Sequence, residues 1–159
     1  TAYEIRNCDW SSDVCSSDLL LYAASQAGVT VELVVRGMCS LRPGVEGISD
    51  NIKVVSVIGQ FLEHSRIFWF ANGGSPELFF GSADWMPRNL DRRVEAVAPI
   101  EDKRLREQLE ELLTLYLQDT GAWHMNADGS FHQHQVEGDH HLVQQTMVKR
   151  WRGGLKPAA

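Results

Sequence analysis

His64 and Arg66 are the residues of this 159-residue chain whose types and spacing best suit chemistry. They lie in FLEHSRIFWF, whose apolar end is typical of a strand, so side chains two positions apart project from one face. An imidazole can attack phosphorus, donate a proton to a leaving oxygen or bind phosphate as an imidazolium. The neighbouring cation would neutralise the phosphate oxygens. A structural histidine satisfied by hydrogen bonds explains the same pattern, and that alternative stays open.

A second cation, Arg36, stands at the end of another predicted strand. VTVELVV is β-branched and nearly continuously apolar, as a buried parallel strand is. Ligands bind beyond the carboxyl ends of strands in open α/β sheets, because the loops diverge there. Gly37 follows Arg36 and leaves room for the guanidinium to reach a phosphate. An ion pair with a surface carboxylate is the alternative role for this arginine.

The segment GSAD, residues 81–84, follows about one strand and one turn after the histidine, and Asn72 lies between them. This order resembles a half-site of the phospholipase D superfamily. There the small GS pair lets the backbone approach, and Asp or Asn orients the imidazole. The resemblance makes Ser82, Asp84 and Asn72 candidates to support or orient His64. Arg66 stands where most members of that superfamily have lysine, which weakens a phospholipase or nuclease interpretation.

Charge permits a phosphate site without requiring one. The chain carries a net charge of −6, but residues 36–93 hold seven basic against six acidic residues, and six of those seven are arginine. The arginine fork suits phosphate oxygens, whereas a surface rich in ion pairs explains the same composition. An extended cationic path for a polyanion would use the remaining arginines of this region: Arg42, Arg88, Arg92 and Arg93.

The order of predicted elements indicates a single α/β domain. The hydrophobic content of 43% and the charged content of 23% are typical of a soluble globular protein of this length. We expect the 54–64 helix to bury Val54, Ile58, Phe61 and Leu62, and the 101–116 helix to bury a face running from Leu105 to Tyr116. Patterning predicts helices at about 19–27, 54–64, 101–116 and 140–151, a loop at 86–91, and strands at 29–35, 66–71, 77–85 and 92–100.

Three segments are predicted along the chain. Residues 1–18 contain WSSDVCSSDL, a near-tandem repeat that resembles translated sequencing-adapter read-through, and are expected to be a non-native or disordered leader. Residues 19–135 would form the catalytic domain, and residues 136–159 a polar C-terminal helix and tail.

Metal and thiol chemistry are weaker interpretations. His132, His134, His140 and His141 form HxH and HH pairs, but no nearby cysteine completes a zinc set, so no metal site is predicted. Cys39 is expected to be an inert core thiol. The three cysteines lack paired spacing, which favours a reducing cytoplasm over a disulfide framework.

Long ungapped segments carry a more specific resemblance. VRGMCSLRPGVEGISDNI, FLEHSRIFWFANGG and FFGSADWMPRNLDRRVEAVAPI closely resemble consecutive blocks of the C-terminal half of type-1 polyphosphate kinases, from about Leu19 to Gln133. The resemblance implies a phospholipase D-like mixed sheet flanked by helices. It also implies reversible transfer of the terminal phosphoryl of ATP to polyphosphate through a phosphohistidine. By motif position, Arg36 would contact phosphate and His64 would line the nucleotide site.

The same resemblance places other parts of the enzyme outside this sequence. The family's phosphorylated histidine, its Mg²⁺-contacting arginines and its adenine-stacking tyrosine belong to segments before Leu19 and have no counterpart here. We therefore expect an inactive fragment whose partners are ATP or ADP, polyphosphate and the remaining domains, with no nucleic acid. The whole enzyme is expected to be a cytoplasmic homo-oligomer, with membrane association left open. Two alternatives remain: a phospholipase D-type phosphodiesterase, and a non-catalytic nucleotide- or polyphosphate-binding module.

Overall fold

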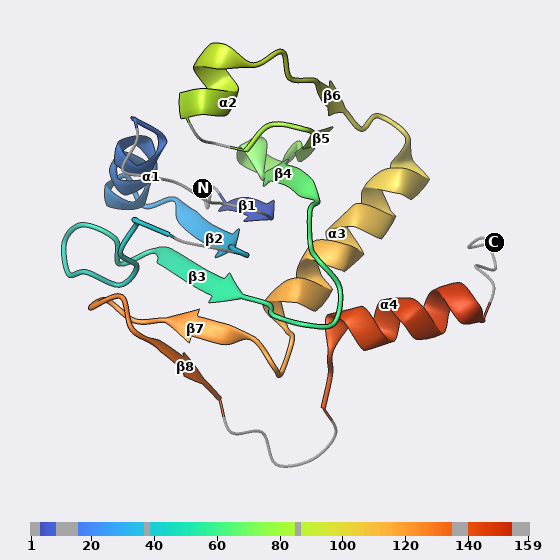
Figure 1. The fold of residues 1–159 in the computed structure, drawn as a ribbon. Helices are drawn as coiled ribbons and strands as arrows, with labels where there is room; N and C mark the ends of the chain where they lie inside the picture. The colour runs from blue at the N-terminus through green and yellow to red at the C-terminus, as the bar shows by residue number, and fades with distance from the viewer. Residues whose placement is uncertain (1–3, 9–15, 37–38, 85–86, 135–139, 154–159) are drawn as a thin grey trace.

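One eight-stranded mixed sheet forms the centre of the molecule, with the strand order β6-β5-β4-β1-β2-β3-β7-β8 (Figure 1). The computed structural model describes residues 4–8, 16–36, 39–84, 87–134 and 140–153. Its elements are β1 (Glu4–Cys8), α1 (Ser16–Gln26), β2 (Thr30–Val34), β3 (Ile52–Ser56), β4 (Arg66–Phe70), the 3-10 turn η1 (Asn72–Gly74), β5 (Glu77–Gly81), α2 (Pro87–Arg92), β6 (Val97–Pro99), α3 (Lys103–Leu117), β7 (Trp123–Met125), β8 (Phe131–Gln133) and α4 (Val143–Arg152).

The strand pairing confirms the predicted mixed α/β sheet in a single domain. β1, β2 and β3 are parallel neighbours, and β4 pairs antiparallel with β1. β4 and β5 form the expected antiparallel pair, joined through the turn at Asn72–Gly74. β7 and β8 form a second antiparallel pair at the opposite edge of the sheet. The sequence analysis did not anticipate that second pair.

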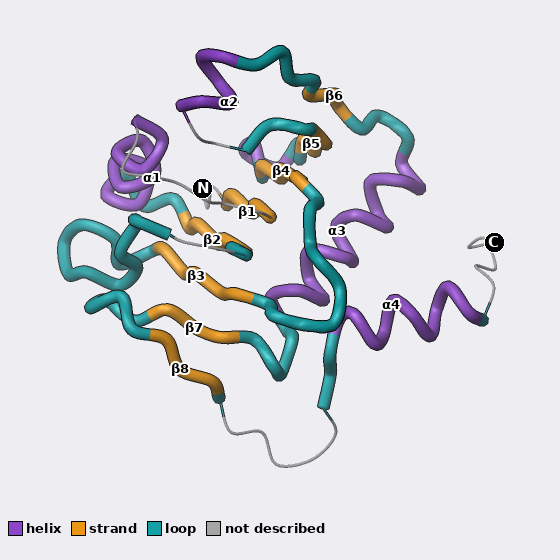
Figure 2. Tube along the Cα trace, viewed as in Figure 1, coloured by secondary structure: helices purple, strands orange, loops and turns teal. Residues whose placement is uncertain are grey.

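Helices cover both faces of the sheet, because β2 and β3 are apolar on both sides. Val31 and Leu33 pack with Leu21 of α1 in one cluster, whereas Val34 packs with Leu113 of α3 in the other. Figure 2 shows α1 on one side of the strands and α3 and α4 on the other. Two cores therefore hold the sheet rigid between them.

The helix ends follow local rules. α1 ends before Gly28, whose φ of +85° is a conformation that glycine adopts without strain. α3 begins after Asp102, whose side chain accepts a hydrogen bond from the Leu105 amide. Leu113 and Tyr116 are buried as expected, but Leu105 is half exposed, so the predicted apolar face starts one turn later.

Two predicted elements are wrong. Residues 54–64 do not form a helix: β3 pairs with β2 and β7, and a loop follows in which Ile58 and Leu62 are exposed. The β-branched run IKVVS fits between two strands, where ladder hydrogen bonds outweigh weak helix propensity. In the second case α2 occupies the predicted loop, and the following strand is limited to Val97–Pro99.

The chain termini also differ from the expected segments. Glu4–Cys8, expected in the leader, form β1 between β2 and β4, and α1 begins at Ser16 rather than at Leu19. β1 pairs through backbone hydrogen bonds with strands on both of its edges. The repeat that follows β1 along the chain shows no sign of this pairing. The non-native origin of residues 1–18 stays a prediction. Near the other end, α4 is a helix as predicted, and its Val143 is buried with Leu113 in one core.

Within the described ranges, none of the helices combines the length and apolar content that crossing a membrane would require.

Candidate active site

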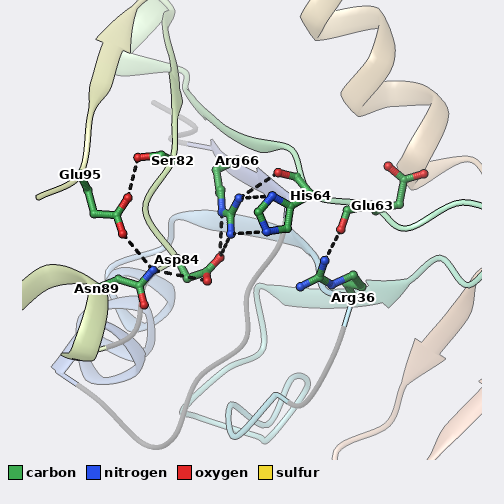
Figure 3. Close-up of polar contacts among 8 residues, drawn as sticks. All are labelled: Arg36, Glu63, His64, Arg66, Ser82, Asp84, Asn89 and Glu95. Atoms are coloured by element: carbon green, nitrogen blue, oxygen red, sulfur yellow. Dashed lines mark hydrogen bonds and ion pairs between the residues drawn. The ribbon is translucent and has the colours of Figure 1, made fainter. Parts of the chain in front are cut away.

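Arg66 and Asp84 form a buried ion pair where β4 begins and β5 ends (Figure 3). Their strands run antiparallel with Arg66 opposite Gly81, which brings the segment after β5, where Asp84 lies, beside the start of β4. Asp84 Oδ1 accepts a hydrogen bond of 2.8 Å from Arg66 Nε and lies 2.6 Å from Nη2. Arg66 is 5% exposed and Asp84 is 8% exposed. The carboxylate therefore fixes the guanidinium in a place where an unpaired charge would be costly.

His64 lies against this guanidinium, and its ring is exposed to solvent. Arg66 Nη1 is 2.6 Å from Nδ1 of His64, and Nη2 is 3.0 Å from Nε2. A neutral imidazole has one acceptor nitrogen, so at most one of these contacts is a hydrogen bond. Arg66 Nη1 also donates to the His64 carbonyl at 3.0 Å. The structure thus brings His64, Arg66 and Asp84 together in a row, with Arg66 in the middle.

Arg36 joins the group from the end of β2. Its Nη1 donates a hydrogen bond of 2.5 Å to the carbonyl of Glu63, the residue before His64. Figure 3 shows the imidazole of His64 between the guanidiniums of Arg36 and Arg66. Arg66, at the start of β4, thus contacts the imidazole, and Arg36, two residues after β2, bonds the carbonyl just before it. That this arrangement binds phosphate stays a prediction.

A clamp on Glu63, which the sequence analysis missed, holds the loop that carries His64. Tyr116 of α3 donates to Glu63 Oε2 at 2.5 Å, and Gln144 of α4 donates to Oε1 at 2.7 Å. Gln144 also bonds both the amide and the carbonyl of Phe61. A side chain on Gly59 would meet the Gln144 amide at 2.2 Å, so this approach requires glycine. These contacts span up to 83 residues of sequence, and no local pattern signals them.

A second set of polar residues, from α2 and the segment before β6, is hydrogen-bonded around Asp84. Asn89 of α2 donates to Asp84 Oδ2 at 3.4 Å and to Glu95 at 3.2 Å. Ser82 donates to Glu95 at 2.5 Å and accepts from the Ala96 amide. Ser82 thus ties the end of β5 to the segment before β6. Asn89 is 2% exposed, and its Oδ1 has no partner among the described residues. The sequence analysis did not single out Asn89 or Glu95.

The other predicted residues lie apart from His64. Asn72 is exposed in the turn after β4, at the opposite end of that strand from His64. Arg92 and Arg93 are exposed at the end of α2, beyond the β5 side of the sheet. The side chain of Arg88 lies outside the described residues. The structure therefore does not bring Asn72, Arg92 and Arg93 into the cluster around His64, and the prediction for Arg88 falls outside the described side chains.

Arg42 shares a cavity with Arg36. The cavity has a volume of about 660 Å³ and opens beyond β2 and β3, beside the β7–β8 hairpin. Arg42 is exposed, and its guanidinium lies over Gly129, where a side chain would collide with it. Of the predicted cationic path, Arg42 is the residue that the fold places with Arg36.

Cys39 and the histidines of the β7–β8 hairpin lie in surroundings unlike those of His64. Cys39 lines the same cavity, but burial raises the pKa of its thiol to about 11, which suits an inert thiol. His124, His132 and His134 cluster at the β7–β8 hairpin in tilted and edge-on contacts, with ring centroids 4.3–5.7 Å apart. Burial, reinforced by these neighbours and Lys53, lowers the pKa of His124 to about 4. Over the described part of the chain, no group of three or more His, Cys, Asp or Glu side chains is arranged to hold a metal ion.

The architecture is a phospholipase D-like mixed α/β sheet flanked by helices. NucT from Helicobacter pylori shares this fold at 12% identity with a TM-score of 0.53, covering 76% of this chain and 80% of that one. Residues 17–145 match the family described as polyphosphate kinase C-terminal domain 2. The chain belongs to this polyphosphate kinase family.

Individual relatives agree with the family match. The polyphosphate kinase of Parasynechococcus marenigrum (strain WH8102) is 63% identical over 86% of this chain, and that of Prochlorococcus marinus (strain MIT 9313) is 58% identical over 88%. The chain spans 20% of the length of each. The crystal structure of polyphosphate kinase from Porphyromonas gingivalis is similar over 96% of this chain and 23% of its own, with 33% identity and a TM-score of 0.84.

Proposed function

We propose that this domain supplies half of the phosphotransferase site of a polyphosphate kinase. That enzyme would move the terminal phosphoryl of ATP to polyphosphate, and back, through a phosphohistidine in another segment. The observation that carries the proposal is the exposed imidazole of His64 between Arg66 and Arg36. Membership of the family supplies the expected substrates, ATP and polyphosphate.

In this mechanism Arg36 holds phosphate oxygens, whereas Arg66, which is buried behind the imidazole and bonded to Asp84 and His64, contributes its positive charge. Neither arginine has to donate a proton. Phosphoryl transfer depends mainly on positioning and charge neutralisation, so fixed guanidiniums suit it. Asp84 keeps Arg66 in place before substrate arrives, so little reorganisation is needed when charge develops. Asp84 would therefore orient His64 through Arg66 rather than by direct contact.

His64 would stabilise the transferred phosphoryl group, or protonate the leaving oxygen of ADP. As the P–O bond to ADP breaks, a proton on the imidazole would pass to that oxygen and leave a neutral ring that can accept from Arg66. Mg²⁺ is expected in the whole enzyme with ligands outside this chain, and it would neutralise phosphate charge there. The arginines and the imidazole described here do not depend on it for their own positions.

The test is His64→Ala in a full-length polyphosphate kinase that carries this domain. We expect polyphosphate synthesis to fall on the order of 10²–10⁴-fold, the range typical for loss of a general acid or base. Retention of activity within a few-fold would remove His64 from the mechanism. Circular dichroism of the variant would check that the exposed position tolerates alanine.

A phospholipase D-type phosphodiesterase is the second enzyme class, because the order of His64, Arg66 and the GSAD segment resembles a half-site of that superfamily. Hydrolysis of a bis-aryl phosphodiester by the complete protein would favour it over phosphoryl transfer to polyphosphate. A binding module without catalysis is the remaining alternative. Calorimetry of this chain with ATP and with short polyphosphate distinguishes that case, because binding by an isolated half-site needs no turnover.

A further inference from the structure

A cavity between α4 and the loop after β3 takes no part in the proposed mechanism. It has a volume of about 390 Å³, and residues 57–61 line one side of it. The other side includes α4 residues spaced three and four positions apart, which share one helix face: Gln145, Val148, Lys149 and Arg152. Gln144 joins the two sides, because its side chain bonds the amide and the carbonyl of Phe61. Figure 1 shows this loop passing beside the start of α4.

Two cations of this lining are available to a ligand. Lys149 and Arg152 are exposed, and neither forms an ion pair within the described ranges. Arg150 lies between them in the sequence but reaches α3, where its Nη2 is 2.7 Å from a carboxylate oxygen of Glu111. Of the three cations in the last turn of α4, two therefore border the cavity without an acidic partner there.

The other polar groups of the lining are compatible with an anion. Asp119 is the acidic residue among them, but it is 6% exposed, and its two oxygens accept hydrogen bonds of 2.7 Å from the amides of Gly121 and Val143. Gln60 and Gln145 are exposed, and their side chains bond no residue that the structure describes. Their amide groups can donate to oxygen acceptors. The cavity therefore suits a ligand with several anionic oxygens.

The loop on one side of this cavity also leads to the candidate active site. Ile58 lines both this cavity and the larger one that contains Arg36 and Arg42, and the same loop continues to His64. Two cations thus border each of two neighbouring cavities. A linear polyanion that is longer than the active site must continue over the adjoining surface. Spaced cations hold such a polymer through its repeated charge.

We propose that Lys149 and Arg152 bind the polyphosphate chain beyond the transfer site, at the cavity between α4 and the loop after β3. The inference rests on the proposed function and names the surface over which the polymer continues. ADP carries two phosphates and ends at the transfer site. The two substrates of the reverse reaction should therefore differ in their dependence on these cations.

The experiment compares both substrates in a full-length polyphosphate kinase that carries this domain. The double variant Lys149→Gln, Arg152→Gln should raise the KM for long-chain polyphosphate by about three- to tenfold, with the KM for ADP within about twofold of wild type. The slope of log KM for polyphosphate against log salt concentration should fall by about one for each cation removed. Arg150→Gln is the matched control on the same helix, because its charge is already paired.

Charge-preserving changes test whether α4 acts through charge. Lys149→Arg with Arg152→Lys should keep the wild-type KM and salt slope. Isothermal titration calorimetry with long-chain polyphosphate gives the same comparison if the reverse reaction is too slow to measure. An unchanged salt slope in the double glutamine variant, or an equal rise in KM for Arg150→Gln, would overturn the inference. Weaker binding to anionic phospholipid vesicles with unchanged polyphosphate affinity would also overturn it, and would assign these cations to a membrane surface.

Failure of the proposed function would look different from failure of this inference. In that case His64→Ala would leave polyphosphate synthesis intact, whatever the α4 variants do. If His64→Ala abolishes synthesis while the double glutamine variant binds long-chain polyphosphate as wild type does, only the α4 site is wrong.

Discussion

A single histidine and a cluster of three histidines lie at different strands of one sheet, and their surroundings differ. His64, before β4, contacts a buried guanidinium that Asp84 holds from behind. His124, His132 and His134, on and after β7 and β8, contact one another, with Lys53 as a nearby cation. The single histidine has an organised charged partner, whereas the larger group has mutual ring contacts.

The partners of a histidine therefore indicate a reactive site better than the number of neighbouring histidines does. A fixed cation beside an exposed imidazole prepares a place for phosphate oxygens. Burial first, and then His134, Lys53 and His132, lower the pKa of His124, and a neutral ring there does not attract an anion.

The contrast between the two groups predicts a large difference in activity. In a full-length enzyme, His64→Ala should lower polyphosphate synthesis on the order of 10²–10⁴-fold, while His132→Ala should stay within about threefold of wild type. Initial rates of ATP consumption and polyphosphate formation measure both. A comparable loss in the two variants would mean that the partner of the imidazole is not what matters.

The buried ion pair predicts a large effect on stability. Arg66→Met leaves the Asp84 carboxylate buried without its partner and should lower the free energy of unfolding by about 3–5 kcal/mol. Arg150→Met provides the control, because Arg150 pairs with Glu111 at a similar distance of 2.7 Å but on the surface. That change should cost at most about 1 kcal/mol. Urea denaturation compares them, and equal losses would contradict the role assigned to burial.

The clamp on Glu63 predicts a smaller effect. Tyr116→Phe keeps the buried ring but removes the hydroxyl that donates to Glu63, and should cost about 1–2 kcal/mol of unfolding free energy. If the clamp positions His64, kcat should fall while the KM for ATP changes little. Gly59→Ala should act in the same direction, since its side chain would displace Gln144. Unchanged kcat in both variants would limit the clamp to a structural role.

The histidine cluster of the β7–β8 hairpin predicts a small dependence of stability on pH. The pKa of His124 falls from 6.5 to about 4, first because of burial and then because of His134, Lys53 and His132. The unfolded chain therefore binds the proton more tightly, so stability is lost as pH falls from about 6.5 to about 4. With allowance for the partly solvent-exposed ring, the loss should be about 1 kcal/mol. Unfolding of wild type and His124→Gln at several pH values measures it, and identical pH slopes would refute the assignment.

Much of the sheet could be predicted because its signals are local. The runs VTVELVV and RIFWF are rich in β-branched and aromatic residues, which favour strands, and Asn72-Gly73-Gly74 supplies the turn between β4 and β5. The same local reasoning failed at residues 54–64, because a short apolar run fits a helix or a buried strand equally well. Pairing with β2 and β7 decided that case.

The residues of the candidate site were likewise predicted only in part. His64, Arg66 and Asp84 were predicted from their order along the chain, and the antiparallel register of β4 and β5 brings them together. Asn72 was predicted beside them, but it lies at the far end of β4 because a strand of five residues separates the two ends. Glu63, with its partners on α3 and α4, had no signal in the sequence.

The residue types of the candidate site, the order of its motifs and most of the strands that carry them could be predicted from sequence, since periodicity and turn residues act over a few positions. Tertiary structure alone decided that Asp84 anchors Arg66, that Glu63 is held by Tyr116 and Gln144, and that Arg36 shares a cavity with Trp123. These contacts join segments far apart in the chain. Their geometry depends on how the sheet packs between its helices, which no local pattern specifies.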